Sequence, residues 1–360
     1  MAEIPEDLIV KILLLLPALT LLRFRCVSKK WRNLIDSPNF VKSHLGRPNK
    51  AHSMMVLFRY DCAYYVDLAS VCNAIDPPVF KQLAYPWHGK DCNYQDLAGP
   101  YNGLFGMYTD IPGPGAILWN PSTRKYFQIP QLNLPDEVRT WSWGFGYDSN
   151  SDDYKVVIIT ANLKSAWDDT DKYIVCVYSL KSGLWKRIGN FPYFLADQGQ
   201  PVVCVGDALH WKVEGPDRSY LIVALHLGKL EYHLVPQPLL RTNNFNLGVL
   251  DGCLYAIYDN MNDHGFDLLV MKEYGVEESW TLLIASTGWR KSFLLKPLAY
   301  TEDGDELIFI TEFNVIVRYE FVTRMFKTMV RRCLPNDFYS YSSLVYIPNL
   351  ICPQNGVRDG

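Results

Sequence analysis

The sequence predicts an α+β protein in two parts, a small N-terminal helical module followed by a large all-β domain. Apolar residues recur at helical spacing as far as Leu45, whereas short apolar stretches separated by Gly, Asp, Asn and Pro follow from residue 54. The 360 residues, 49% of them hydrophobic and 20% charged, can form one large core and one small one. We therefore expect a module at 1–45, a linker at 46–53, a β-domain at 54–350 and a tail at 351–360.

Charge and cysteine content narrow the partners and the compartment. The net charge is -3 and no run of five like charges occurs, so nucleic acid is not an expected partner. The nine cysteines are odd in number, widely spaced and without a CxxC pair. This pattern favours reduced thiols over disulfides or a zinc site. We therefore expect a cytoplasmic or nuclear protein that holds no metal and no cofactor.

The apolar opening has the hydrophobicity of a membrane or secretion signal, but its details argue against one. Acidic residues precede the run, Lys11 lies inside it and Pro17 divides it. A signal peptide needs a basic start and an unbroken apolar stretch. The stretch from Leu8 to Leu22 is also shorter than the roughly 20 residues needed to span a bilayer. No membrane contact is expected.

Short helices explain the same residues better. Pro5 suits the first position of a helix that Pro17 ends. Thr20 and Ser28 are expected N-caps of a second and a third helix, and a further turn begins at Ser37. So few helices leave two possibilities for their leucines: a private core, or a core with an exposed apolar stripe that a partner covers.

The opening also contains a recognisable motif. The stretch IPEDLIVKILLLLPALTLLRFRCVSKKWRNLI (4–35) resembles an F-box, with small departures at Ile4 and Leu19. The resemblance implies binding to an Skp-family adaptor, which links indirectly to a cullin scaffold and a RING subunit. By match to the motif, the main adaptor contacts are expected from Pro5, Leu8, Ile12, Leu13, Leu16, Pro17 and Leu22. Val27, Trp31 and Leu34 are expected either in that contact or in the module's own core.

One phrase recurs through the β-domain: an apolar strand, a short polar turn and a strand that carries an aromatic residue. It occurs at 117–129, 175–188, 222–235, 268–284 and 315–329. Its equivalent points Asn120, Ser179, His226, Lys272 and Glu320 are separated by steps of 59, 47, 46 and 48 residues. A period near 48 residues is typical of one β-propeller blade.

A second hairpin, with Gly or an acid at its tip, lies between these phrases. Examples are VVCVGDALHWKV (202–213) and LGVLDGCLYAIYD (247–259). Two hairpins per period make four strands, and MMVLFRYDCAYYVDL (54–68) is a candidate for the first blade. We predict an irregular β-propeller of about six blades. A β-sandwich is the alternative, because the first spacing is irregular and the Gly-Gly doublet of kelch repeats is absent.

The β-domain also resembles a known family. LWNPSTRKYFQIP, GFGYDSNSDDYKVV and VMKEYGVEESWTLL are similar to signatures of the plant F-box-associated domain of the S-locus F-box and CPR-like groups. The resemblance implies that this domain binds a target protein, and we expect loops at one face to do so. The stretches 85–94 and 165–173 mix aromatic and charged residues as binding hot spots do, but packing explains Trp87 and Trp167 equally well. No target-binding residue is assigned.

Catalytic residues are not expected. GxSxG, HExxH, a Walker loop and GxGxxG are all absent from the sequence. His210, His226 and His233 have no converging acid or thiol, so we interpret them as satisfied or surface histidines. A propeller-type oxidoreductase, which needs a copper site of Tyr, His and Cys, is the remote alternative.

Paired acids are likewise no sign of catalysis. Asp152-Asp153 and Asp168-Asp169 fall in polar loops, and we interpret them as solvated turn acids. The two resemblances together imply the substrate-recognition subunit of an SCF-type ubiquitin ligase, which promotes ubiquitination and degradation of its target by proximity. A non-degradative F-box scaffold is the alternative. An S-locus ribonuclease in self-incompatibility and a stress or immune protein are the two implied classes of target.

Overall fold

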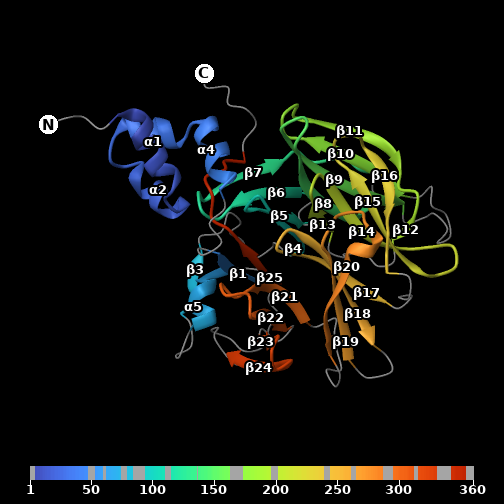
Figure 1. Cartoon of the computed structure of the whole chain (residues 1–360). Coiled ribbons are helices and arrows are strands. Elements are labelled where there is room, and N and C mark those ends of the chain that lie inside the picture. The colour runs from blue at the N-terminus through green and yellow to red at the C-terminus, as the bar shows by residue number, and fades with distance from the viewer. Residues whose placement is uncertain are drawn as a thin grey trace.

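Four short helices lie beside a six-bladed β-propeller in the computed structural model (Figure 1). The structure describes residues 5–47, 53–59, 62–73, 79–83, 94–109, 115–135, 137–162, 173–195, 202–238, 244–260, 265–286, 295–311, 315–330 and 342–353. The prediction of a helical module followed by an irregular propeller is confirmed. The β-sandwich alternative is wrong, because the strands form six separate sheets instead of two packed ones.

The module consists of α1 (Glu6–Leu14), α2 (Ala18–Phe24), α3 (Lys29–Ile35) and α4 (Pro38–Leu45). Ser28 caps α3, as predicted, by accepting a hydrogen bond from the backbone N–H of Trp31 over 3.1 Å. Ser37 caps α4 in the same way. The expectation that Thr20 caps the second helix is wrong: α2 begins directly after Pro17, whose fixed φ leads into a helix without a side-chain cap.

Each sheet of the propeller is one blade. Blade 1 contains β25 (Ser342–Tyr346), β1 (Met54–Arg59), β2 (Cys62–Asp67) and β3 (Lys81–Leu83), with α5 (Leu68–Asn73) after β2. Blade 2 contains β4 (Tyr94–Tyr101), β5 (Leu104–Thr109), β6 (Gly115–Asn120) and β7 (Lys125–Ile129). Blade 3 contains β8 (Val138–Asp148), β9 (Asp153–Asn162), β10 (Tyr173–Ser179) and β11 (Leu184–Asn190).

The other three blades repeat the pattern. Blade 4 contains β12 (Phe194–Leu195), β13 (Val203–Val205), β14 (Ala208–Glu214), β15 (Tyr220–His226) and β16 (Glu231–Val235). Blade 5 contains β17 (Phe245–Leu250), β18 (Cys253–Asn260), β19 (Gly265–Met271), η3 (Glu277–Ser279) and β20 (Trp280–Ser286). Blade 6 contains β21 (Leu295–Tyr300), β22 (Glu306–Thr311), β23 (Ile316–Glu320) and β24 (Met325–Val330).

The ring is closed by a strand from the far end of the sequence. β25 pairs antiparallel with β1, in a register that sets Val345 opposite Met55. The first described strand of the β-domain therefore gains its inner neighbour from the last. Closure of this kind leaves the sheet ends short and protected, as propellers require.

Hydrophobic clusters fill the interfaces between neighbouring blades all the way around the ring. The recurring aromatic residue of the outer hairpin belongs to these interfaces. Trp185 of β11 donates its indole N–H to the carbonyl of Pro130, which follows the outer strand of blade 2, over 2.8 Å. Trp280 of β20 makes the equivalent bond to Pro236 after blade 4, also over 2.8 Å. The repeated sequence pattern thus supplies the aromatic side chain that joins each of these outer hairpins to the preceding blade.

Candidate functional site

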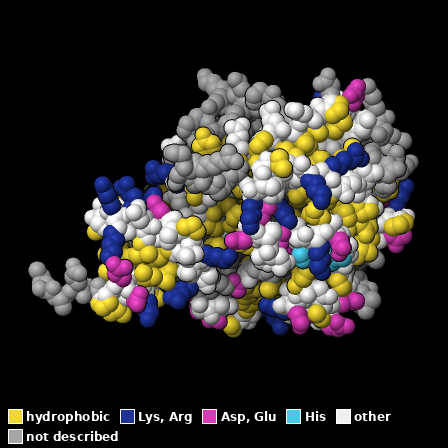
Figure 2. Space-filling view, turned by 90° about the horizontal axis from the view of Figure 1, so that it is seen from above, with side chains coloured by type: hydrophobic (Ala, Val, Ile, Leu, Met, Phe, Trp, Pro, Cys, Tyr) yellow, Lys and Arg dark blue, Asp and Glu magenta, His cyan; other side chains and the backbone are white. Residues whose placement is uncertain are grey.

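Large apolar side chains lie exposed on the helical module. They are Leu8, Ile12, Leu15, Leu19 and Val27, with exposed fractions between 39% for Leu19 and 74% for Leu15. We call these five residues the apolar face. Figure 2 shows hydrophobic side chains gathered on the module, with acidic and basic ones beside them. Contiguous apolar surface with a polar rim is typical of a protein-binding site.

The two sides of α1 differ sharply in burial. Leu8 and Ile12 are four residues apart, and Leu15 follows at the end of the helix three residues later, so the three share one side. Leu13 lies on the opposite side and is only 1% exposed. It packs in the module's own core with Leu21 and other apolar residues of the four helices. The module therefore has a core together with an exposed apolar stripe, which is the second of the two possibilities that the sequence left open.

The ten residues expected at the adaptor contact occupy all three classes of burial. Pro5, Leu8, Ile12 and Val27 are exposed, Leu16, Pro17, Leu22, Trp31 and Leu34 are half-buried, and Leu13 is buried. Sequence reasoning did not include Leu15 and Leu19, which extend the apolar face. The spacing of four and then three residues from Leu8 is the signal that identifies Leu15.

Polar contacts hold the helices that carry the apolar face. The imidazole Nε2 of His44 in α4 lies 2.9 Å from the carbonyl oxygen of Leu16, which joins α4 to the turn after α1. Arg25 after α2 donates to the carboxylate of Asp36 after α3 over 2.7 Å. These contacts fix the ends of the helices and leave their apolar side chains outward.

A second candidate surface is the cavity inside the propeller. It has a volume of about 1610 Å³ and is lined largely by the innermost strands, with His44 and Leu45 of α4 at its border. Lys296 of β21 is open to this cavity, and its ammonium donates to the carbonyl of Ser343 over 2.8 Å. Although the side chain is exposed to the cavity, the strands around its ammonium displace much of the surrounding water, and this desolvation lowers the pKa of Lys296 to about 8. A concave space of this size suits a protein segment, but the geometry assigns no individual target contact.

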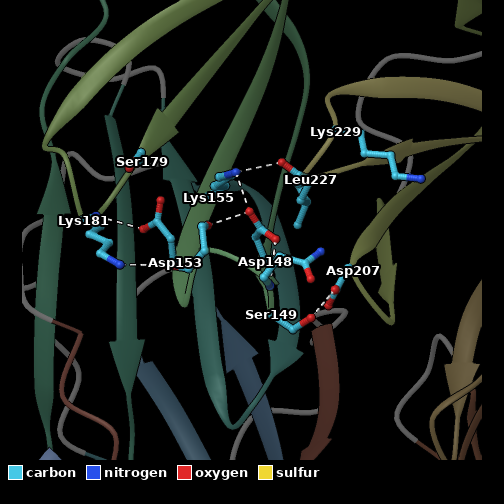
Figure 3. A network of polar contacts seen from close by, with 12 residues as sticks. Asp148, Ser149, Asp153, Lys155, Ser179, Lys181, Asp207, Leu227 and Lys229 are labelled. Carbon is cyan, nitrogen blue, oxygen red and sulfur yellow. Dashed lines mark hydrogen bonds and ion pairs between the residues drawn. The ribbon is translucent and has the colours of Figure 1, made fainter.

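The stretch GFGYDSNSDDYKVV forms the β8–β9 hairpin and joins two blades through charge (Figure 3). Lys155 donates to the carboxylate of Asp148 and to the carbonyl of Leu227 in blade 4, each over 2.8 Å. Ser149 donates to the carboxylate of Asp207, also in blade 4, over 2.5 Å. Burial alone would raise the pKa of Asp148, but hydrogen bonds, chiefly from Lys155, hold it down at about 2. These acids support the fold.

The interpretation of Asp152-Asp153 as solvated turn acids is half wrong. Asp152 is exposed, and its carboxylate lies 3.4 Å from the ammonium of Lys42 in α4. Asp153 is only 5% exposed, because the hairpin turns its carboxylate toward the next turn, where it accepts the backbone N–H of Lys181 over 2.8 Å. The pair Asp168-Asp169 lies outside the described residues.

The histidines are satisfied, as predicted. His210 is fully buried, with Nδ1 3.3 Å from the carbonyl of Val203 and Nε2 2.8 Å from the hydroxyl of Tyr274. His233 approaches the same hydroxyl at 3.2 Å. Burial lowers the pKa of His210 to about 4, so the ring is neutral at ordinary pH. His226 accepts the backbone N–H of Gly228 over 3.0 Å.

Within the described ranges, no group of three or more His, Cys, Asp or Glu residues is arranged to hold a metal ion. In the same part of the chain, no helix is long and apolar enough to cross a membrane. The two stretches that mix aromatic and charged residues, for which binding and packing were equally good explanations, lie almost wholly outside the described residues: 85–93, with Trp87, and 165–172, with Trp167.

Family models match both parts of the chain. Residues 1–43 match the F-box domain, and residues 90–322 match the F-box associated beta propeller domain. The second match covers most of the blades described above. The first match covers α1 to α3 and most of α4, and the second covers β4 to β23, whereas β1–β3, β24 and β25 lie outside both.

Individual plant proteins are similar over 79% to 98% of the chain. The chain is 32% identical to F-box protein CPR1 of Arabidopsis thaliana, over 98% of this chain and 89% of that protein. It is 34% identical to F-box protein At4g22390 of the same plant, over 79% of this chain and 74% of that protein. It is 27% identical to the F-box/kelch-repeat protein At3g23880 of the same plant, over 87% and 86%.

Proposed function

We propose that this chain, which belongs to the plant F-box proteins with an F-box associated β-propeller domain, is the substrate-recognition subunit of an SCF-type ubiquitin ligase. The helical module would bind an Skp-family adaptor, and through it a cullin scaffold and a RING subunit. The propeller would bind the target protein. We expect the complex to act in the cytoplasm or the nucleus.

The observation that carries the proposal is the apolar face. Ile12 and Leu15 are 54% and 74% exposed and lie outside the module's own core. Because only the exposed part of each side chain would leave water, covering it with a partner would contribute about 1–2 kcal/mol before the cost of ordering the interface. An adaptor that presents a matching apolar groove supplies that cover.

The role proposed for the chain in ubiquitin transfer is proximity. A target bound to the propeller is held near the ubiquitin-carrying enzyme that the RING subunit recruits, which raises the effective concentration of its lysines. In this scheme the chain holds the target and the other subunits supply the chemistry. The buried and hydrogen-bonded state of His210 and Asp148 is consistent with a structural role for them.

Co-expression with an Skp-family adaptor, followed by size-exclusion chromatography, tests the proposal. We expect a one-to-one complex with the full chain and none with a chain that lacks residues 1–45. Ile12→Asp should also abolish the complex. Leu184→Asp is the matched control, because Leu184 is 68% exposed but lies on β11 of the propeller. A full chain that binds no adaptor, or an Ile12→Asp chain that binds normally, would overturn the proposal.

The target and its fate need a separate measurement. A non-degradative scaffold would bind the adaptor equally well, so the half-life of a bound target with and without a proteasome inhibitor distinguishes the two roles. An S-locus ribonuclease and a stress or immune protein are the target classes to compare. We expect the half-life of the true target to lengthen when the proteasome is inhibited.

A further inference from the structure

The chain does not end at the last strand of the propeller. After β25, residues 347–353 run without helix or strand between blade 2 and the helical module (Figure 1). We call residues 347–353 the strap. The boundary expected between 350 and 351 falls in the middle of it, and the residues on both sides of that boundary are buried.

The strap is tied to blade 2 by a buried amide. Asn349, 4% exposed, donates to the carbonyl of Asn102 over 2.5 Å, and its side-chain oxygen accepts from the amide of Asn120 over 2.7 Å. Asn120 is fully buried and also donates to the carbonyl of Ile351 over 2.8 Å. Because a buried amide without partners is costly, this pairing fixes where the strap lies on the blade.

Blade 2 leaves room for this amide at a glycine. Gly103 has a φ of +69°, and a Cβ built there would lie 1.9 Å from the side-chain nitrogen of Asn349. Any larger residue at 103 would therefore push the strap away. The turn and the strap are complementary in shape as well as in hydrogen bonding.

The next two side chains of the strap enter different cores. Leu350, 7% exposed, packs in the core of the helical module with Leu13 and Leu21. Ile351, 8% exposed, packs in the cluster between blades 2 and 3, which Val41 of α4 also borders. One short segment thus completes the module's core while it is anchored in the propeller.

We propose that the strap locks the helical module onto blade 2 in one orientation. The C-terminal segment would then both complete the core of the F-box and fix its position on the propeller. The module would then not be a freely moving unit on a linker. The consequence for ubiquitin transfer rests on the proposed function: a rigid receptor presents the bound target at a fixed position, which favours a subset of its lysines. Leu350 and Asn349 are positioning residues in this scheme.

Hydrogen exchange of the full chain tests the first half of the proposal. Leu350→Ala should speed exchange in α1 and α2 by roughly 30-fold or more, the factor that matches the lower cost of truncating a buried leucine. Ile351→Ala is the matched control, since the two residues are adjacent, equally buried and similar in size. It should act mainly on blades 2 and 3. Equal exchange of α1 and α2 in wild type and Leu350→Ala would overturn the proposal.

A distance measurement tests the second half. Spin labels at Lys11 and Lys229, both exposed, would report the orientation of the module on the propeller, carried on bio-orthogonal amino acids because the chain has nine cysteines. We expect one narrow distance distribution for wild type and a broad one for Asn349→Ala. A distribution equally broad in the wild type would overturn the proposal.

Gly103→Ala provides a second test that leaves the strap's own sequence intact. It should broaden the distribution as Asn349→Ala does. Gly252→Ala is its control, because Gly252 also has a positive φ, +82°, but a Cβ there meets nothing within 4 Å. If both alanines broaden the distribution equally, backbone strain is responsible and the strap is not.

These measurements need no adaptor and no target. A full chain that shows the narrow distance but binds no adaptor would overturn the proposed function and leave the strap in place. If the hydrogen-exchange test and both distance tests contradicted the strap but the chain still bound the adaptor, the strap proposal would be overturned and the proposed function would stand. The two proposals can therefore fail separately.

Discussion

The helical module and the propeller use the same apolar residue types in opposite ways. In the propeller, each blade has a neighbour on both faces, so large side chains such as Trp119 and Trp211 are at most 2% exposed. In the module, Ile12 is 54% exposed directly beside the buried Leu13. Four short helices enclose only a small core, whereas a closed ring covers both faces of its sheets and leaves exposed apolar side chains such as Leu184 of β11 and Leu282 of β20 on outer strands. The exposed apolar side chains that share one side of α1 therefore indicate a partner, while the buried apolar residues of the strands indicate only the next blade.

The neighbouring pair Ile12 and Leu13 gives the sharpest test of this comparison. Leu13→Ala should lower the free energy of unfolding of the module by about 2–5 kcal/mol, the usual cost of truncating a buried leucine. Ile12→Asp should leave that free energy unchanged and weaken adaptor binding by at least ~30-fold, as expected at an interface hot spot. Urea denaturation and calorimetric titration with the adaptor measure the two effects.

The contrast between the module and the propeller would disappear if Leu13→Ala and Ile12→Asp both lowered the stability of the module and neither changed adaptor binding. In that case the apolar face would be part of the fold, and the module would resemble a blade in its use of leucine. Leu13→Asp, the substitution that the motif suggests first, is a poorer choice because a carboxylate at a site 1% exposed should unfold the module.

A buried charge pair within blade 3 holds in place the ammonium that reaches blade 4, since Lys155 binds both Asp148 and the carbonyl of Leu227. Asp148→Ala should lower the free energy of unfolding by about 3 kcal/mol, because it leaves the ammonium of Lys155 inside the protein without its carboxylate. Glu231→Ala, which removes an exposed acid from β16, should change it by less than about 0.5 kcal/mol. Guanidinium denaturation followed by tryptophan fluorescence measures both. Equal effects would mean that the network in Figure 3 is no more important than a surface acid.

Local features of the propeller were predictable from the sequence, and distant ones were not. The inner hairpin β13–β14 and the outer hairpin β15–β16 are each set by residues within about a dozen positions, so alternation and turn residues identify them. The pairing of β25 with β1 joins opposite ends of the β-domain, and neither strand carries a sign of its partner. The strap lacked a signal for the same reason.

The candidate site shows the same limit at the scale of single residues. The motif indicated which residues belong to the module, but not which side of α1 faces out. Leu13, Leu14 and Leu15 are consecutive leucines with buried, half-buried and exposed side chains, because the helix turns by about 100° per residue. Asp153 was assigned to solvent for a related reason: its partner Lys181 belongs to another hairpin.

Acid should destabilise the propeller through His210. Its pKa in the folded protein, about 4, lies below the ordinary value of 6.5, so the stabilisation is present above pH 6.5 and is lost as the pH falls toward 4. We expect a loss of about 2 kcal/mol between pH 7.5 and pH 5. His210→Asn should flatten this dependence, and His226→Gln should not. Urea denaturation over this pH range measures it, and a flat wild-type profile would contradict the prediction.

The smallest effect is expected where the module and the propeller meet through exposed charge. The ammonium of Lys42 and the carboxylate of Asp152 lie 3.4 Å apart, with side chains 71% and 58% exposed. Their chemistry equals that of Lys155 and Asp148, which are 12% and 2% exposed, but water screens the exposed pair. Lys42→Ala should therefore cost less than about 1 kcal/mol, decrease in effect with added salt and leave the module's orientation unchanged.

Denaturation at low and high salt, together with the distance between labels at 11 and 229, checks this expectation. Lys29→Ala, an exposed lysine of the same module, is the control. If Lys42→Ala broadened the distance distribution as much as Asn349→Ala, the module would be held by surface charge and not by the strap. A null effect would instead place the connection between the two regions in buried contacts, where the amide of Asn349 and the side chain of Leu350 lie.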